Sequence, residues 1–259
     1  MKKTELFNVL NKIAPLDLQE EWDNCGVQID LGKDEIDKVL LALEIDKDVV
    51  DFAAECGAEM IITHHPLIFP PNDMRALSVC NVNQKNIISL IKKGIEVYSA
   101  HTCYDAAPGC MNDYLCEILG IQSPQTISGN ILRIGKLKEP VRLSDFEKTV
   151  KTALGDPQGV LCGGDPKALI RTIAVCSGGG GSFWEDAYKA GADLYVSGEL
   201  GHHDMGYIGQ TNMAFIAAGH AATEWIFVPR LASQLKRMCM DQIEVAEYPG
   251  HQIPFSRVL

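Results

Sequence analysis

Histidines are few in this chain, and they fall where a sheet-based metal site would need them. The 259-residue sequence has seven histidines, and six of them lie in four short polar patches, each just after a strand-like apolar run. In open α/β sheets, ligands bind beyond the carboxyl ends of strands, so patches far apart in sequence can converge there. Imidazole and carboxylate groups that converge in this way are common ligands of divalent transition metals. The pattern therefore predicts metal binding.

The first two patches supply imidazoles and a carboxylate. His64 and His65 are adjacent and precede a proline that restricts the backbone, so both rings could turn toward one crevice and serve two neighbouring ions. A polar surface turn explains the same residues. In the second patch, His101 and Asp105 are spaced as a ligand and its orienting partner would be, and Asp105 is the ligand candidate. The alternative is a turn before Pro108.

The third patch has the spacing most typical of a metal site. His220 and Glu224 are four residues apart, so on a helix both side chains lie on one face, and a carboxylate can bridge two ions. A simple exposed pair on a helix would also explain this spacing. The fourth patch, residues 198–204, includes Glu199 and fits a role beside the ligands or toward a substrate as well as it fits ligation.

Two further features each have alternative explanations. The glycine loop of residues 177–182 could hold an anion on its backbone N–H groups, but it lacks the lysine and hydroxyl residues of a P-loop, and a tight turn explains it as well. The stretch 22–26 is either a rim element or a turn.

Nine cysteines without CxxC spacing are typical of reduced thiols. Cys103 and Cys110 lie close to the polar patches, and we interpret both as buried core residues.

The elements that must position these patches alternate between apolar strand-like runs and amphipathic helix-like runs, which predicts mainly parallel sheets covered by helices. This alternation runs to about residue 125 and then restarts. We therefore predict two α/β domains, residues 1–125 with the first two patches and residues 126–259 with the glycine loop and the third patch. The expected strands are 39–43, 60–62, 95–99, 130–134, 170–176, 194–196 and 214–217, and the expected helices are 6–13, 48–56, 83–93, 111–119, 143–154, one from the glycine loop through 190, and 221–238.

Charge and hydropathy exclude some classes of function. The formal net charge is −11 and the pI is about 5.1, whereas direct nucleic-acid binding needs clustered lysine and arginine. No run reaches the roughly 18 apolar residues of a membrane span. Charges interrupt the apolar residues at the start of the chain, which is not the pattern of a signal peptide. We expect a cytoplasmic protein with no membrane segment.

Four stretches together resemble the GTP cyclohydrolase I type 2 homologue family, also called the Nif-three-like dinuclear metal-centre family. The resemblance runs from about residue 5 to residue 250 and is to the short members, which lack a central insertion. The stretches are Trp22-Asp23-Asn24-Cys25-Gly26-Val27-Gln28, Thr63-His64-His65-Pro66-Leu67-Ile68-Phe69, His101 to Asp105, and Gly219 to Glu224.

The resemblance implies a ligand set for two divalent metal ions in each subunit. Glu224 would contact both ions, and His101 would be a neighbour of the ligands. The family usually has asparagine in place of Cys103 and glycine in place of Cys110, so hydrogen bonding beside Asp105 differs in this chain. The implied ligands are His64, His65, Asp105, His220 and Glu224.

The resemblance also implies an architecture and an assembly. Members have two interlinked three-layer α/β domains with mixed sheets, the Nif-three-like fold. They assemble into a homohexameric ring whose metal sites face an internal cavity. We adopt both as expectations for this chain.

Two functions of different classes fit these expectations. The first is a metal-dependent hydrolase of a nucleotide-like or other small substrate, in which His101 or Glu199 would relay protons as catalytic residues. Five protein ligands shared by two ions leave room for water, which favours catalysis. The alternative is a non-catalytic metal-handling or scaffold protein with partners such as transcription regulators. Mixed imidazole and carboxylate sites accept zinc, iron, manganese, cobalt or nickel, and zinc and iron are our leading candidates.

Overall fold

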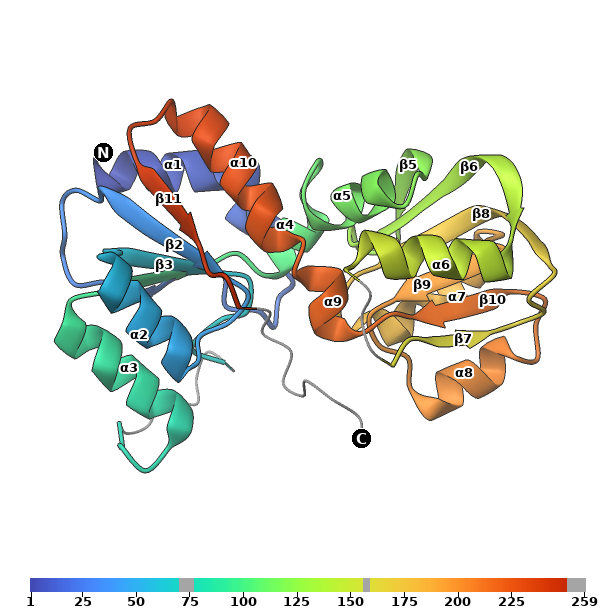
Figure 1. Ribbon diagram of the computed structural model, residues 1–259, viewed down its shortest axis with the longest axis horizontal. Coiled ribbons are helices and arrows are strands. Elements are labelled where there is room, and N and C mark those ends of the chain that lie inside the picture. The colour runs from blue at the N-terminus through green and yellow to red at the C-terminus, as the bar shows by residue number, and fades with distance from the viewer. Residues whose placement is uncertain (70–76, 156–158, 251–259) are drawn as a thin grey trace. The chain divides into compact units, whose positions relative to one another are not determined.

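The computed structural model describes residues 1–69, 77–155 and 159–250, and these form two compact units. The first unit comprises Met1–Cys110 together with the segment that begins at Phe227, and the second comprises Met111–Ile226. The chain therefore leaves the first unit after Cys110 and returns to it at Phe227. Each unit contains a mixed sheet with helices (Figure 1), so the predicted α/β class with two mixed sheets is confirmed.

The first unit is a sheet between two layers of helices. Its elements are α1 (Lys3–Ile13), η1 (Leu16–Leu18), β1 (Gly26–Ile29), β2 (Lys38–Ala42), α2 (Lys47–Cys56), β3 (Met60–Thr63), α3 (Val82–Lys93), β4 (Glu96–Ser99), α4 (Thr102–Ala106), α10 (Phe227–Cys239) and β11 (Glu244–Glu247). Among the described residues the strand order is β1-β4-β3-β2-β11. All neighbours are parallel except β1 with β4. Helices α2 and α3 cover one face, and α1 and α10 cover the other (Figure 1).

Local signals fix the helices that support this sheet. Helix α2 begins after Asp46, whose side chain accepts a hydrogen bond from the Val49 N–H, and ends at Gly57 in the left-handed region. Helix α3 has the same signals in Asn81 and Gly94. Its buried residues join those of α2 against the sheet in one apolar core, which includes Leu40, Val50, Ala53, Ile61, Ile87, Leu90 and Val97.

Two neighbouring interior strands of the first unit, β3 and β4, end side by side. β3 and β4 are parallel, and Thr63 lies opposite Ser99 in their register. The residues that follow these strands therefore start at the same edge of the sheet. This register places the first and second polar patches, which begin at His64 and His101, next to each other.

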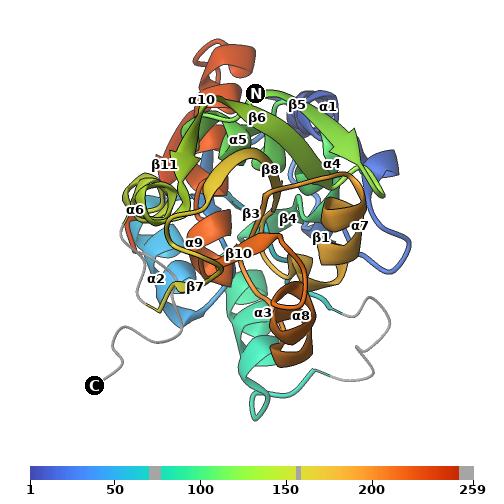
Figure 2. The same cartoon turned by 90° about the vertical axis from the view of Figure 1, so that its right-hand side faces the viewer.

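The second unit has a six-stranded sheet in the described part of the chain, in the order β5-β6-β8-β9-β10-β7. Its elements are α5 (Met111–Ile118), β5 (Gln122–Ile127), β6 (Leu132–Arg142), α6 (Leu143–Ala153), β7 (Leu161–Gly163), β8 (Leu169–Cys176), η2 (Gly180–Phe183), α7 (Trp184–Lys189), β9 (Leu194–Ser197), α8 (His202–Ile208), β10 (Ala214–Ala217) and α9 (His220–Glu224). Helices α6, α7 and α8 lie around this sheet (Figure 2). β8, β9 and β10 are parallel, and Cys176 and Ala217 both lie opposite Ser197. The glycine loop and the third and fourth patches thus begin at one edge.

The structure divides the helix that the sequence predicts over residues 221–238. Helix α9 ends at Glu224, and α10 begins at Phe227. Pro229 explains the break, since proline has no N–H to donate and is tolerated in the first turn of a helix but not in its interior. The predicted continuous helix is therefore wrong. The break also divides the chain between the two units, because α10 belongs to the first.

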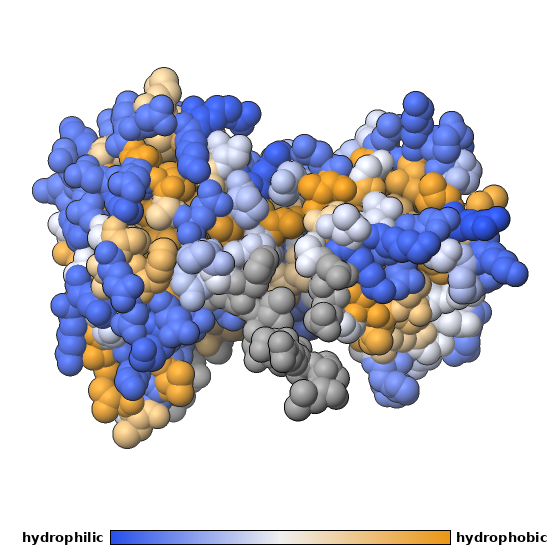
Figure 3. All heavy atoms as spheres, viewed as in Figure 1, coloured by the Kyte–Doolittle hydropathy of each residue, from blue (hydrophilic) through white to orange (hydrophobic). Residues whose placement is uncertain are grey.

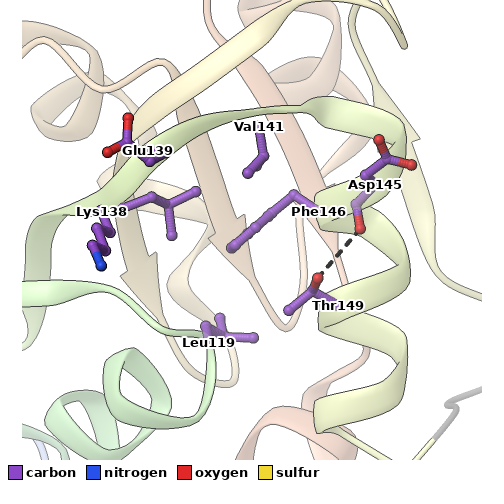
Figure 4. A pocket seen from close by; sticks show the side chains of 8 residues that line it. Leu119, Lys138, Glu139, Val141, Asp145, Phe146 and Thr149 are labelled. Atoms are coloured by element: carbon purple, nitrogen blue, oxygen red, sulfur yellow. Dashed lines mark hydrogen bonds between the residues drawn. The ribbon is translucent and has the colours of Figure 1, made fainter.

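Two surface features lie apart from the polar patches. On the visible face, hydrophobic residues gather over the start of α3 (Figure 3), where Val79 and Val82 are exposed. In the second unit, residues of β6 and α6 together with Leu119 line a groove of about 310 Å³ (Figure 4). Its apolar residues are Leu119, Leu137, Val141 and Phe146, and its polar residues are Lys138, Glu139, Asp145 and Thr149. None of these groove residues belongs to a polar patch. In the described ranges, no helix is long and apolar enough to cross a membrane.

Candidate metal centre

His64 lies at the carboxyl end of β3 with its ring orientation fixed. Its Nδ1 is 2.9 Å from the carbonyl oxygen of Ala100, so Nδ1 donates this hydrogen bond and Nε2 is the ring nitrogen left to bind an ion. That Nε2 atom lies 3.8 Å from Oδ1 of Asp105. Both side chains are buried. An imidazole nitrogen and a carboxylate oxygen at this separation can ligate the same ion.

His65 and His101 complete a cluster of three imidazoles with His64. Each of the three residues offers one ring nitrogen, and these nitrogens all lie within 4.8 Å of one another. The backbone N–H groups of His64 and His65 both donate to the carbonyl oxygen of Leu43, which holds the adjacent residues at the end of the sheet. His65 Nδ1 is also 3.5 Å from Oε2 of Glu44. The cluster has the donor set of a transition-metal site.

A carboxylate that sequence reasoning did not identify orients His101. Asp23 Oδ1 is 2.9 Å from His101 Nδ1, and the Thr102 N–H donates to Asp23 Oδ2 over 3.0 Å. Burial by itself would raise the pKa of Asp23, but hydrogen bonds from His101, Thr102 and Cys25 outweigh burial and hold it well below its usual range. Asp23 is therefore an anion that directs Nε2 of His101 away from itself, as carboxylates beside metal-binding histidines do.

The second patch folds into the short helix α4, which begins directly after His101. The carboxylate that hydrogen bonds to His101 is Asp23, whereas Asp105, one turn later, approaches His64. Cys103 and Cys110 are buried, as expected. A hydrogen bond with Cys25 and burial raise the pKa of the Cys103 thiol, so it stays protonated. We call His64, His65, His101 and Asp105 the first ligand group.

In the second unit, His220 and Glu224 form the second ligand group on α9. Their side chains meet as the four-residue spacing predicts, with His220 Nε2 3.0 Å from Glu224 Oε2. His220 Nδ1 lies 3.3 Å from Oε2 of Glu199, whose side chain is 63% exposed. Glu199 thus stands beside a candidate ligand, at the nitrogen that faces away from Glu224.

The glycine loop packs closely against the second ligand group. Gly178 has a φ of +58°, and a Cβ atom there would collide with Oε1 of Glu224 and come within 3.2 Å of His220 Nε2. The Gly178 N–H donates to Thr223 Oγ1 over 3.0 Å, which ties the loop to α9. Gly198 is equally confined, since its Cβ would lie 2.7 Å from Thr223 Oγ1. Small residues in this loop let the backbone approach the Glu224 carboxylate.

The two histidines of the fourth patch, His202 and His203, belong to neither ligand group. His202 and His203 begin α8, and both are exposed. Their rings contact each other edge to face with centroids 5.5 Å apart. They make suitable control positions for substitutions in the ligand groups.

The chemistry of the donors fits transition-metal ions in each unit. The first ligand group combines imidazoles with a carboxylate, and the second pairs an imidazole with a buried carboxylate. Hydrogen bonds at the opposite nitrogens of His64 and His101 leave Nε2 as the nitrogen that could bind an ion. The structure thus contains candidate metal-binding residues of the kind that the sequence predicts.

Comparisons with known proteins agree on one family. The family model described as Duf34/NIF3 (NGG1p interacting factor 3) matches residues 1–254. The GTP cyclohydrolase 1 type 2 homolog of Clostridium perfringens (strain 13 / Type A) is 33% identical over 262 residues, which cover 98% of this chain and 99% of the relative. The NIF3-like protein 1 of Drosophila melanogaster is 28% identical, with 92% and 85% covered.

Solved structures share the whole fold. The Bacillus cereus protein related to NIF3 superposes with a TM-score of 0.93 at 22% identity and covers 100% of this chain and 99% of its own. Reduced HcgD from Methanocaldococcus jannaschii superposes with a TM-score of 0.81 at 27% identity, with 96% and 98% covered. The match of the family model over nearly the full length, together with these relatives, shows that the chain belongs to the Duf34/NIF3 (NGG1p interacting factor 3) family.

Proposed function

We propose that this chain is a hydrolase that depends on two divalent metal ions, with a nucleotide-like or other small molecule as substrate. The observation that carries the proposal is the cluster of three imidazoles whose ligand atoms lie within 4.8 Å of one another. The relatives named GTP cyclohydrolase 1 type 2 homolog support a hydrolytic reaction. The proposed ligands are His64, His65, Asp105, His220 and Glu224, and zinc or iron are the ions that we favour.

Helix α10 contributes an aromatic contact to the first ligand group within the first unit. Phe227, the first residue of α10, has its ring 5.3 Å from that of His64. This contact packs the buried imidazole of His64 against an apolar neighbour.

The proposed reaction assigns proton handling to two further residues. Bound ions would supply Lewis-acid activation of water and of the substrate. His101 is anchored through Nδ1 by the anionic Asp23, so its Nε2 can accept a proton or hold a ligand in a fixed direction. Glu199 is exposed beside His220 and can exchange protons with solvent. We propose His101 and Glu199 as the residues that relay protons.

The test is hydrolysis by the metal-loaded, full-length protein against nucleotides such as GTP and against small esters. We expect turnover in the wild type and none in Glu224→Gln, which keeps the shape of the side chain but removes the charge that binds ions. His203→Ala is the matched control, because it removes an exposed histidine outside both ligand groups. Turnover that persists in Glu224→Gln contradicts the proposal.

A second candidate function is a non-catalytic role in handling metal or in binding protein partners. The family description, which names an NGG1p interacting factor, favours it. In that case, the wild type would bind metal without hydrolysing any compound of the panel. Both functions keep the proposed ligands and the proposed homohexameric ring, whose size light scattering would measure.

A further inference from the structure

Two large aromatic side chains of the first unit are exposed next to each other, and one of them contacts His101. Trp22 is 54% exposed and Phe69 is 49% exposed. The ring centroids of Trp22 and Phe69 are 5.9 Å apart with an interplanar angle of 82°. Trp22 and His101 are also 5.9 Å apart, at 77°. One indole thus contacts both an exposed phenyl ring and an imidazole of the first ligand group, while half of its surface faces solvent.

Side-chain amides hold the two segments that carry these rings together. Asn24 Nδ2 donates to the Ile68 carbonyl oxygen over 2.8 Å, and the Ile68 N–H donates to Gln28 Oε1 over 3.1 Å. Gln28 Nε2 in turn donates to the Asn24 carbonyl oxygen over 2.7 Å. These bonds join the turn after Trp22 to the residue before Phe69, so the exposed rings are held in place before any ligand binds. Such preorganisation lowers the cost of binding.

From this arrangement we infer that Trp22 and Phe69 form a stacking platform for a planar heteroaromatic ring of the nucleobase class. The inference rests on the proposed function, since the ring would belong to the substrate of the metal centre. Rings that meet edge to face leave aromatic surface open, and a flat ring can stack on it. The contact between Trp22 and His101 would then set the bound ring beside the residue that we assign to proton transfer.

The charge of the chain limits the ligand to a small molecule. Aromatic side chains stack on any nucleobase, so the platform alone does not distinguish a nucleotide from a nucleic acid. A nucleic acid also needs a basic surface for its phosphates, and this chain has a net charge of −11. A single nucleotide needs less basic surface, because divalent ions at the ligand groups can balance the charge of its phosphate.

Calorimetric titration of the metal-loaded, full-length protein tests the platform with two probes, GMP and ribose 5-phosphate, which lacks the ring. We expect Trp22→Leu to weaken GMP binding by about 10-fold or more and to leave ribose 5-phosphate binding unchanged. Trp22→Phe, which keeps a ring, should retain most of the affinity. Tyr207→Leu is the matched control, since Tyr207 is an aromatic residue of the second unit with 55% exposure. Phe69→Leu provides a second test if Trp22→Leu does not fold.

Three results would overturn the platform. They are equal GMP affinity in the wild type and both leucine variants, no binding of GMP by the metal-loaded wild type, and a smaller assembly of Trp22→Leu in light scattering, which would make Trp22 a subunit contact. Metal content is measured for every sample. A wild type that holds metal but fails these tests counts against the platform alone, whereas a wild type that holds no metal counts against the proposed function.

Discussion

The two ligand groups are held in place by different means. In the first group, hydrogen bonds from the rings to buried acceptors orient the imidazoles: His64 donates to the Ala100 carbonyl oxygen and His101 to Asp23. In the second group, the backbone of the glycine loop packs against the Glu224 carboxylate, and the carboxylate beside His220 Nδ1 is that of the exposed Glu199. The first ligand group thus depends on hydrogen bonds of its histidine rings. The second depends on glycine, which lets the backbone approach Glu224.

This difference determines which substitutions should matter in each unit. Where a buried partner fixes a ring, removing the charge of that partner should weaken metal binding without a change of shape. Where the backbone packs against a carboxylate, adding a single methyl group should displace it. An exposed partner should contribute little, because solvent screens it and can replace it.

The largest effect is expected for Gly178→Ala in the second group. The new Cβ would collide with Glu224 Oε1, and the positive φ of Gly178 adds backbone strain. We expect the free energy of unfolding to fall by about 2 to 4 kcal/mol and the second ligand group to lose its metal affinity. Gly191→Ala is the control, because its φ of +79° is similar but nothing lies within 4 Å of its Cβ. Chemical denaturation and metal titration measure both, and equal effects of the two variants would mean that the collision is unimportant.

An intermediate effect is expected for Asp23→Asn in the first group. The amide keeps the size of the side chain but removes the charge that orients His101. Metal affinity should fall by about 10- to 100-fold, as measured by competition with a chromogenic chelator. Asp17→Asn, at an exposed aspartate in η1, should leave the affinity unchanged. Wild-type metal affinity in Asp23→Asn would show that Asp23 does not support metal binding.

The smallest effect is expected for Glu199→Gln, which makes the same chemical change beside His220. Glu199 is 63% exposed and 3.3 Å from His220 Nδ1, so metal affinity should change by less than about threefold. The same chelator competition measures it. A loss as large as that of Asp23→Asn would show that exposed and buried partners contribute equally.

Sequence periodicity predicted the central strands of both sheets but none of their edges. All four strands that it missed, β1, β5, β7 and β11, are edge strands in the two sheets as described. β5 is almost wholly exposed, so no apolar alternation marks it. Strands β2, β3, β9 and β10 are almost wholly buried and carry apolar runs, which is why a sequence reveals them.

The pairing of His220 with Glu224 was predictable because their spacing is local, whereas the groups that support the candidate ligands were not. His220 and Glu224 are four residues apart, so helical geometry alone brings them together. Asp23 meets His101 across 78 residues of chain, and nothing in the turn around Asp23 indicates a partner. The role of the glycine loop was also not predictable from sequence, since its sequence fits both an anion-binding loop and a tight turn. Its approach to Glu224 depends on the parallel register of β8, β9 and β10.

The central claim is the proposal that the residues of the two ligand groups bind metal ions. The most direct test is metal content per chain, measured by mass spectrometry on wild-type protein, His64→Ala and His220→Ala, each purified without chelator or affinity metal. We predict about two ions per wild-type chain and a clear loss in both variants, although the two histidines lie in different units. A wild type without metal, or wild-type metal content in both variants, would contradict the proposed ligands.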